Sequence, residues 1–524
     1  MAVMHKGQYI TSSLYTFENM REGNYLYVDK TEYLWKLVQQ PHSMFFFSRP
    51  RRFGKSLTLS TLKAIFQGKK ELFKELFIEN QPYDWKSYPV LHIDMGSVSA
   101  SSPDSLTEDL MNKITSLAFD FNIELSRRTA HGCFEELIQK LHKRDGKVVI
   151  LVDEYDKPIL NNIENENIDK IQALMKIFYS VIKTCEPYER FVFITGVGKF
   201  LKVSVFSDLN NLNDISMHDD YSTMCGYTEK ELETYFKDRL IPLATKYNFT
   251  YKDFCQEIKN WYDGYCFSEE AEKVYNPVSF TKFLENNGKF KNYWFETGTP
   301  NILFKLFKKA NYSLEEALNR TYNVESFAAF SPTDVNFISL MYQTGYLTIK
   351  DSKAINHRFT YKLGFPNYEI EDSFYNSLIN STNSETYHSD SINYDIYNAL
   401  ENDDVDKMMS TVDYFLAGIP YDMQLKNEKY YQTVFYSIFK IIGTGIKTEV
   451  QTSNGRIDAI IENDTSIYIF EFKLNKSAKT ALDQIITKEY YKPFLNTKKK
   501  ITLIGADFDS SKRRLNGWKK SNLN

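Results

Sequence analysis

The chain has 524 residues, which corresponds to roughly two to four domains with room for buried cores. Apolar residues make up 42% and aromatic residues 15%, so a chain dominated by disorder is excluded. The net charge of −4 also excludes a polycation that coats nucleic acid along its whole length. The charge is uneven, however: from Phe472 to the end, 13 Lys or Arg stand against 4 Asp or Glu, which indicates a local anionic partner.

The five cysteines form no CxxC pair and have no histidines at zinc-ligand spacing, so neither a disulfide scaffold nor a structural zinc is expected. The N-terminal residues lack the apolar core of a signal peptide, and no apolar run approaches the ~20 residues that cross a bilayer. We therefore expect a cytoplasmic protein that has no membrane partner.

Short apolar runs separated by long helical patterns follow one another through the first part of the chain. The runs cover residues 43–47, 90–93, 148–152 and 191–194, and each is apolar on both faces. Buried parallel strands joined by crossover helices have this pattern. We therefore expect a parallel-sheet α/β domain at residues 1–220.

Beyond this domain the pattern changes twice. Residues 221–380 are mostly helical in pattern, and 381–424 is typical of a polar linker followed by a helical connection. Residues 425–524 mix strand and helix patterns, and we expect a small separate α/β domain there. Its expected helices are 427–442 and 479–491, and its expected strands are 447–452, 457–461, 467–472 and 501–504.

A phosphate-binding loop is predicted after the first apolar run. The sequence Arg49-Pro-Arg-Arg-Phe-Gly54-Lys55-Ser56 opens a helix, and it departs from the P-loop pattern only where Arg49 replaces the first glycine. A helix N-terminus offers free N–H groups and a positive dipole end to phosphate. Gly54 permits close backbone approach, Lys55 reaches the β- and γ-phosphates of ATP, and the Ser56 hydroxyl can ligate Mg²⁺.

Two acids and a hydroxyl complete the predicted nucleotide site. The run 148–152 leads into Asp153 and Glu154, at the strand end where ligands bind in open α/β sheets. We expect Asp153 to hold Mg²⁺, Glu154 to orient or deprotonate the attacking water, and Thr195 to sense the γ-phosphate. The structural alternative is that the two acids cap the following helix.

Arg49, Arg51 and Arg52 have two readings. They either lie in a solvated turn, or they touch phosphate or act as an arginine finger on a neighbouring subunit of a homo-oligomer. The residues expected to bind the nucleotide are Arg52, Phe53, Gly54, Lys55, Ser56, Leu57, Asp153 and Thr195.

A second site is predicted on two C-terminal strands joined by the polar turn 463–466. A symmetric hairpin places Asp458 opposite Glu471, and the two-residue period of a strand puts Lys473 on the face of Glu471. Facing carboxylates repel, and a divalent cation between them removes the conflict. The constellation suits metal-assisted phosphodiester hydrolysis, in which Lys473 positions water or stabilises charge. The alternative is a surface ion pair of Glu471 with Lys473.

Other side chains are weaker candidates for the same site. Glu449 and Glu428 could join the metal shell, and Gln484 either contacts the site or is an ordinary polar helix residue. Basic residues near these strands are expected to neutralise phosphates of nucleic acid. They are Lys476, Lys479, Lys488, Lys492, Lys498 to Lys500 and Lys512 to Arg514.

At these residues the sequence resembles a bacterial family that joins an N-terminal AAA-ATPase-like domain to a C-terminal PD-(D/E)XK nuclease-superfamily domain. The resemblance runs nearly end to end. Its motifs are Tyr27-Val-Asp-Lys-Thr31, the loop 49–56, Val152-Asp-Glu-Tyr-Asp-Lys-Pro158, Trp261-Tyr-Asp-Gly-Tyr265, Tyr275-Asn-Pro277, Tyr342-Gln-Thr-Gly-Tyr-Leu-Thr348, Gly455-Arg-Ile-Asp458, Glu471-Phe-Lys473 and Gln484.

The resemblance implies a P-loop-type parallel sheet domain, a helical middle region and a C-terminal restriction-endonuclease-like α/β domain. It also implies ATP and Mg²⁺ at the first site, and a nuclease centre using Mg²⁺ or Mn²⁺ at Asp458, Glu471 and Lys473. Trp261, Asp263, Tyr265, Asn276 and Gln343, in the middle motifs, have no clear chemistry. They are expected to build a lid or a domain interface, or, for the aromatic residues above all, to pack in the core.

The first functional hypothesis is an ATP-dependent, metal-dependent nuclease that cleaves nucleic acid, with DNA as the expected substrate. Related architectures suggest phage defence or mobile-element biology by analogy. The alternative is a nucleotide-switched nucleic-acid-binding or signalling protein whose nuclease-like domain does not cut. A third reading is an ATPase that remodels protein partners.

Overall fold

The computed structural model divides into two compact units. The N-terminal unit contains Met1–Glu296 and Thr321–Glu369, and the C-terminal unit contains Thr297–Arg320 and Ile370–Asn524. Among the helices that are described, none is both long and apolar enough to cross a bilayer. The structure describes residues 7–199, 211–294, 303, 306, 314–328, 336–356, 358–382, 389–417, 428–441, 445–452, 454–509, 511–512 and 514–523.

A five-stranded parallel sheet forms the centre of the N-terminal unit. Its strands are β1 (Ser43–Ser48), β2 (Val90–Asp94), β3 (Val148–Asp153), β4 (Glu189–Gly196) and β5 (Asn213–Asp214). The strand order is β2-β3-β4-β1-β5, and all neighbours pair in parallel. β1, β3 and β4 are buried along almost their whole length, as their apolar runs predict. Because the strands are parallel, the carboxyl ends of these three strands meet at one edge of the sheet.

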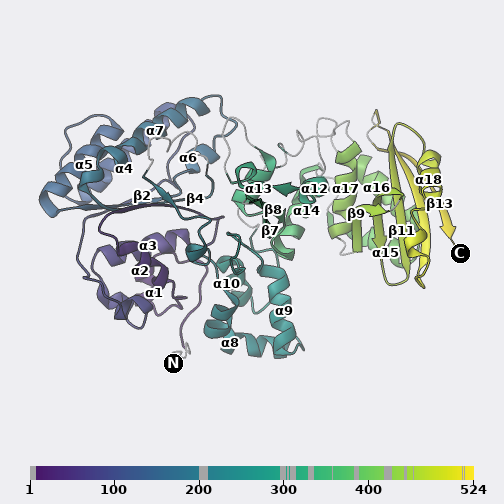
Figure 1. Ribbon diagram of the computed structural model, residues 1–524, viewed down its shortest axis with the longest axis horizontal. Helices are drawn as coiled ribbons and strands as arrows, with labels where there is room; N and C mark the ends of the chain where they lie inside the picture. The colour runs from purple at the N-terminus through teal and green to yellow at the C-terminus, as the bar shows by residue number, and fades with distance from the viewer. Residues whose placement is uncertain are drawn as a thin grey trace. The chain divides into compact units, whose positions relative to one another are not determined.

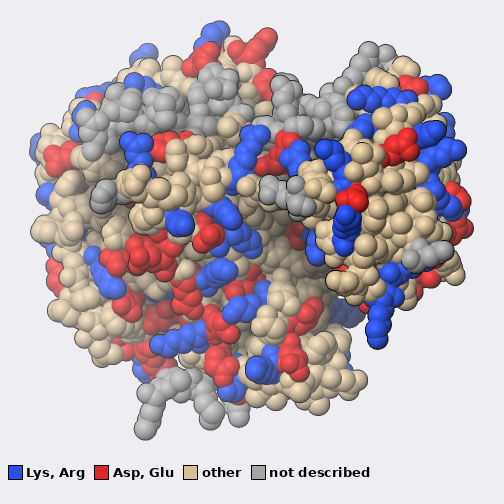
Figure 2. All heavy atoms as spheres, turned by 45° about the vertical axis from the view of Figure 1, so that its right-hand side comes forward, with Lys and Arg blue, Asp and Glu red and all other residues tan. Residues whose placement is uncertain are grey.

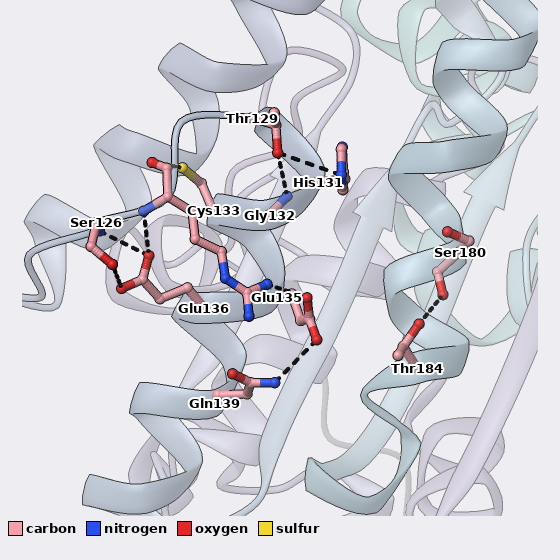
Figure 3. A network of polar contacts seen from close by, with 11 residues as sticks. Ser126, Thr129, His131, Gly132, Cys133, Glu135, Glu136, Gln139, Ser180 and Thr184 are labelled. Carbon is pink, nitrogen blue, oxygen red and sulfur yellow. Dashed lines mark hydrogen bonds and ion pairs between the residues drawn. The ribbon is translucent and has the colours of Figure 1, made fainter.

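Helices cover both faces of this sheet. They are α1 (Phe17–Glu22), α2 (Thr31–Val38), α3 (Lys55–Phe66), α4 (Pro103–Asp120), α5 (Ala130–Asp145), α6 (Lys157–Leu160) and α7 (Ile168–Thr184). α1, α2 and α3 lie on one face, and α4, α5 and α7 lie on the other (Figure 1). The loop before α5 is held by the Glu136 carboxylate, which accepts hydrogen bonds from Ser126 N at 2.8 Å and Arg127 N at 2.9 Å (Figure 3).

A helical cluster and a small sheet complete the N-terminal unit. The elements are α8 (Glu229–Lys246), α9 (Tyr251–Tyr262), α10 (Pro277–Glu285), β6 (Thr321–Tyr322), α13 (Phe337–Thr344), β7 (Thr348–Ile355) and β8 (Arg358–Gly364). Aromatic residues such as Phe236, Phe254 and Phe280 fill the core between α8, α9 and α10. The mostly helical middle region that was expected is confirmed, and the sheet β6-β8-β7 is an additional feature of it.

The C-terminal unit is built on a mixed five-stranded sheet. Its elements are α12 (Leu314–Leu318), α14 (Tyr368–Thr382, which begins two residues before the unit), α15 (Ser389–Glu401), α16 (Val405–Ala417), α17 (Glu428–Ile441), β9 (Gly445–Thr452), β10 (Gly455–Glu462), β11 (Ser466–Leu474), α18 (Ala478–Thr487), β12 (Lys500–Asp509) and β13 (Arg514–Leu523). The order is β13-β12-β11-β10-β9, with only β11 and β12 parallel. This is the α/β class that the sequence predicted, with β13 as a further strand.

Each face of the C-terminal sheet has its own apolar core. On one face, Met409 and Phe415 of α16 and Phe435 of α17 belong to the same buried cluster as Phe470 of the sheet. On the other face, Ile485 of α18 packs with strand residues. The segment 381–424, predicted as a linker and helical connection, therefore contributes α15 and α16 to a core of this unit.

Glu189, at the start of β4, is a fully buried acid. Both of its carboxylate oxygens lack a hydrogen-bond partner among the residues described. Burial, and secondarily the charge of Glu186, raises the pKa of Glu189 from 4.5 to about 9. Between these two pH values the folded protein keeps a proton that the unfolded chain releases. The contribution of Glu189 to the free energy of unfolding is therefore complete below pH 4.5, and it declines as the pH rises toward 9.

We expect Glu189→Gln to flatten the loss of stability with rising pH, because glutamine has no proton to release on unfolding. The measurement is thermal unfolding of both proteins from pH 5 to pH 8. The exposed Glu166 provides a matched control, and Glu166→Gln should follow the wild-type curve. Parallel curves for wild type and Glu189→Gln would contradict the assignment of a protonated buried carboxyl.

Candidate nucleotide-binding site and nuclease centre

The predicted phosphate loop lies between β1 and α3 at the carboxyl edge of the N-terminal sheet. Gly54 precedes the first residue of α3 and has a φ of +92°, a conformation that residues with a side chain rarely adopt. The backbone of the loop therefore requires glycine at this position. Free N–H groups of the first turn of α3 are available at this edge, as a phosphate site needs.

Arg49, which stands where a P-loop has its first glycine, is buried with 2% of its surface exposed. Its guanidinium donates to the carbonyl oxygens of Ser216 at 2.6 Å and of Ser222 at 3.2 Å. The rings of Phe47 and Phe267 lie 4.3 and 4.1 Å from the guanidinium carbon. Burial lowers the pKa of Arg49 to about 10. Neither predicted reading holds for Arg49, which anchors the loop inside the protein.

The other two arginines of the loop are placed differently. Arg51 is exposed, in agreement with a solvated turn. Arg52 has a φ of +69° and donates to the carbonyl oxygen of Tyr293 at 2.6 Å. A contact of Arg52 with nucleotide stays a prediction.

Lys55 is buried beneath its own loop. Its Nζ donates to the carbonyl oxygens of Arg49 and Pro50, each at 2.9 Å. Burial lowers the pKa of Lys55, and the nearby charges of Asp153 and Asp156 oppose that shift. A phosphate bound in the loop would offer the ammonium group a charged acceptor in place of these two carbonyls.

Asp153 and Thr195 meet across neighbouring strands. The Thr195 hydroxyl donates to Asp153 Oδ1 at 2.7 Å, and the Glu154 N–H donates to the same oxygen at 2.9 Å. The alternative role as a helix cap is not observed for Asp153, because the residue that precedes α6 is Asp156. Thr195 therefore orients the Asp153 carboxylate, and its contact with a γ-phosphate stays a prediction.

Glu154 adopts a φ of +49°, and its Oε2 accepts a hydrogen bond from Lys157 Nζ at 2.8 Å. An ideal Cβ on Gly96 would lie only 2.8 Å from both Glu154 Oε2 and Asp94 Oδ1. The missing side chain of Gly96 thus leaves room for two carboxylates beside Lys157. Glu154 is held at the β2 side of the sheet edge, and its role toward water stays a prediction.

Asp156 is a residue of this edge for which no role was predicted. It is buried, and its Oδ2 accepts hydrogen bonds from Val197 N at 2.9 Å and Gly198 N at 2.6 Å. Burial raises the pKa of Asp156 to about 6. The residue lies inside the motif 152–158, so the motif itself was the available signal. Asp156 ties the end of β3 to the chain that follows β4.

The aromatic motifs of the middle region pack against the phosphate loop. The Phe53 ring lies 4.7 Å from Tyr265, edge to face, and the Tyr265 hydroxyl donates to Gly345 O at 3.1 Å. Gln343 Oε1 accepts a hydrogen bond from Lys199 N at 2.9 Å. For Tyr265 the core-packing reading is correct. Phe53, which was expected to bind the nucleotide, is buried and supports the loop from inside, and its contact with nucleotide stays a prediction.

A small pocket opens beside the start of α3. Its walls include Gly54 and Leu57, both of which were expected to bind the nucleotide. Apolar and aromatic residues from the chain before α2 and after β5 form the other walls, among them Leu26, Tyr27, Val28, Met224 and Tyr227. A flat apolar group attached to a phosphate chain in the loop could enter this pocket.

In the C-terminal unit, β10 and β11 form the hairpin that the sequence predicted. Ala459 pairs with Phe470 and Ile460 with Ile469. Extending this register by one residue would set Asp458 against Glu471. In the turn, Asn463 Oδ1 accepts hydrogen bonds from two following N–H groups, which fixes the hairpin length. The predicted register is confirmed.

Side chains converge around Glu471, whose side chain is 3% exposed. Lys473 Nζ donates to Glu471 Oε1 at 2.7 Å, and Gln484 of α18 donates to the same oxygen. The Asp458 carboxylate reaches across the hairpin and accepts a hydrogen bond from Phe472 N at 2.7 Å. The alternative of an exposed surface pair is therefore wrong, and Gln484 contacts the site.

The donor set at this hairpin fits a magnesium ion. Two carboxylates on adjacent strands match a cation that takes one or two acids and completes its shell with water and phosphate. No group of three or more His, Cys, Asp or Glu placed to hold a metal occurs in the described part of the chain. The side chains of Glu428 and Glu449 lie outside the described residues, so their membership stays a prediction.

The basic residues near this centre fall into two groups. Three basic side chains of β12 and β13 are paired with acids of the α15–α16 region: Lys500 with Asp403, Lys520 with Asp406, and Arg514 with Asp413. Lys476 precedes α18, Lys479 lies in its first turn and Lys488 follows its last residue. All three are exposed, and none has an ion pair among the residues described. Lys and Arg side chains gather over this unit, at the right of Figure 2. The lysines at α18 are therefore better placed to meet phosphate.

Comparison with known proteins agrees with the architecture of an N-terminal AAA-ATPase-like domain and a C-terminal nuclease-superfamily domain. Models for a predicted AAA-ATPase and for the PD-(D/E)XK nuclease superfamily match residues 12–206 and 426–518. A relative, "Uncharacterized protein in vnfD 5'region" of Azotobacter chroococcum mcd 1, is 36% identical over 515 residues, covering 96% of this chain and 97% of that protein.

Solved structures of two Aeropyrum pernix proteins are similar at 10% identity. The ORC2 protein in its ADPNP–ADP complexes has a TM-score of 0.29, covering 72% of this chain and 96% of that chain. The ORC1 protein in complex with DNA has a TM-score of 0.26, covering 66% of this chain and 90% of that chain.

We expect Arg49→Ala to destabilise the protein by about 3 kcal/mol or more, because it leaves buried carbonyl oxygens without their charged donor. Urea denaturation of the full chain measures the effect. Arg51→Ala, two residues away and exposed, should change the free energy of unfolding by less than about 0.5 kcal/mol. Equal stability of the two variants would show that Arg49 does not anchor the loop.

Proposed function

Because the chain belongs to the family of predicted AAA-ATPases that carry a C-terminal PD-(D/E)XK nuclease-superfamily domain, we propose that it is an ATP-dependent, metal-dependent nuclease acting on DNA. The observation that carries the proposal is the meeting of Asp458, Glu471, Lys473 and Gln484 on one hairpin and its neighbouring helix. A role in phage defence or mobile-element biology follows only by analogy of architecture.

The nuclease centre works through charges that the fold has already positioned. Asp458 and Glu471 would hold Mg²⁺ or Mn²⁺, which supplies positive charge to the attacked phosphodiester. Lys473, whose ammonium group is 2.7 Å from Glu471, orients water toward the phosphate and stabilises the negative charge that develops there. Gln484 donates to Glu471 and keeps the carboxylate turned toward the site. Lys476, Lys479 and Lys488 bind flanking phosphates.

At the nucleotide site, the loop N–H groups and Lys55 bind the phosphates of ATP. Ser56 and Asp153 would hold Mg²⁺, which neutralises charge on the β- and γ-phosphates. Thr195 keeps Asp153 in one orientation through the 2.7 Å hydrogen bond between them. Glu154 orients the attacking water in one of two ways. Its carboxylate leaves Lys157 and turns to the water, or it holds the water while it stays paired with Lys157.

A chain of contacts supports coupling between the nucleotide loop and the C-terminal unit. Arg52 of the loop donates to Tyr293 O, and the next residue, Trp294, donates its N–H to Glu369 Oε1 at 2.8 Å. The chain passes between the two units directly after Glu296 and again after Glu369. A nucleotide that moves Arg52 would therefore act on both of these connections. Burial raises the pKa of Glu369 to about 7, so its attraction for Arg52 changes near neutral pH.

We expect Lys473→Ala to lower the rate of cleavage of supercoiled DNA, in the presence of Mg²⁺ and ATP, by about 100-fold or more, because a preorganised charge at the reacting phosphate is lost. Lys407→Ala, which removes an exposed lysine of α16, is the matched control and should cut at the wild-type rate. Equal cutting by wild type and Lys473→Ala would reject the catalytic assignment. Salt-sensitive binding without cleavage by the wild type would favour a non-cutting switch.

We expect Glu369→Ala to reduce the ratio of cleavage rates measured with and without ATP, because the contact between the two connections is lost. Binding of a fluorescent ATP analogue should stay unchanged, since Glu369 is not part of the phosphate site. The exposed Glu270 gives the control Glu270→Ala, which should keep the wild-type ratio. An unchanged ratio in Glu369→Ala would contradict coupling through this contact.

A further inference from the structure

The hairpin formed by β7 and β8 leaves the small sheet of the N-terminal unit as a two-stranded ribbon (Figure 1). β6 pairs with β8 only at Tyr361 and Lys362, near the base of the hairpin. Beyond these residues β7 and β8 pair only with each other, as far as Ile355 opposite Arg358. The part of the hairpin between these residues and the turn is therefore two-stranded, and no third strand extends it.

The base of the ribbon is fixed firmly to the unit. The Tyr361 hydroxyl donates to the Glu269 carboxylate, and Ser352 Oγ donates to Glu269 O at 3.1 Å. The Phe327 ring lies 5.2 Å from Tyr361 in an edge-to-face contact. These contacts hold one face of the hairpin at its base, so the ribbon has a defined position within its unit.

The other face of the ribbon is exposed and basic. Residues directly opposite each other in an antiparallel pair have their side chains on the same face, and every second pair shares that face. The basic face carries the pairs Lys353–Thr360, Ile355–Arg358 and Asp351–Lys362. It therefore carries three basic side chains and one acid. Lys353, Arg358 and Lys362 are exposed and have no ion pair within the described part of the chain. Asp351 lies opposite Lys362, so the face keeps an excess of positive charge.

Apolar side chains near the tip complete the surface. Ile355 is 50% exposed and Phe359 is 44% exposed, one on each face of the ribbon. Single exposed apolar residues are common on protein surfaces, and here both lie beside the basic side chains of the tip. Basic residues beside exposed apolar ones are the composition of ribbons that enter a groove of nucleic acid.

We propose that the β7–β8 ribbon is a second nucleic-acid contact, which binds the phosphate backbone and groove of a duplex outside the nuclease-superfamily domain. A two-stranded ribbon has the width that the major groove of DNA admits. Lys353 and Arg358 meet phosphates, while Ile355 and Phe359 lie against sugars or base edges. The ligand class rests on the proposed function, since duplex DNA is the substrate proposed there.

The test is equilibrium binding of a fluorescent 30-base-pair duplex to the full chain, with Ca²⁺ in place of Mg²⁺ so that the DNA stays intact. We expect Lys353→Gln/Arg358→Gln to weaken binding about 10-fold at moderate salt. We also expect the slope of log K against log salt to fall by roughly 2, because each lost phosphate contact removes about 0.9. The control Lys143→Gln/Lys183→Gln removes two exposed lysines from α5 and α7 and should bind like wild type.

Each outcome bears on the ribbon, and the two proposals fail differently. Wild-type affinity and slope in the ribbon variant overturn the ribbon contact and leave the proposed nuclease standing. Absence of salt-sensitive duplex binding by the wild type overturns both. Binding of the ATP analogue by the variant, at wild-type affinity, shows that the variant is folded.

Discussion

The phosphate loop depends on the buried guanidinium of Arg49. A charged group without a facing carboxylate is costly to bury, and here carbonyl oxygens and two aromatic rings replace the lost water. The loop can keep its shape without its first glycine because the side chain that replaces it turns inward and fastens the loop to Ser216, Ser222 and Phe267. Lys55 takes its position from that fastened loop, because its ammonium group donates to the carbonyl oxygens of Arg49 and Pro50.

The nuclease hairpin meets the opposite problem, because two acids face each other with little water around them. Lys473 and Gln484 donate to Glu471, and the Phe472 N–H donates to Asp458, so each carboxylate has a positive or polar partner from the protein itself. These partners hold the two carboxylates in place before a cation binds, so little free energy is needed to rearrange them afterwards. A centre held in this way needs only small movements to accept a cation and a phosphate.

Local patterns allowed much of the fold to be predicted. The buried strands of the N-terminal sheet follow from apolar runs, and the register of the hairpin that carries Asp458 and Glu471 follows from the position of one polar turn. The inward turn of Arg49 could not be predicted, because its partners lie more than 160 residues away. Nor could strand β13, whose Lys, Asn and Ser residues have the polarity of an exposed edge and lack an apolar period.

The helices α15 and α16 supply one wall of the C-terminal core, although they precede residue 426, where the nuclease-superfamily match begins. Acids of this region also fasten the last two strands through Lys500, Lys520 and Arg514. A chain that begins at residue 426 would keep α17 on this face of the sheet but would lack the apolar side chains of α15 and α16. The compact structural unit is therefore longer than the stretch that matches the nuclease superfamily.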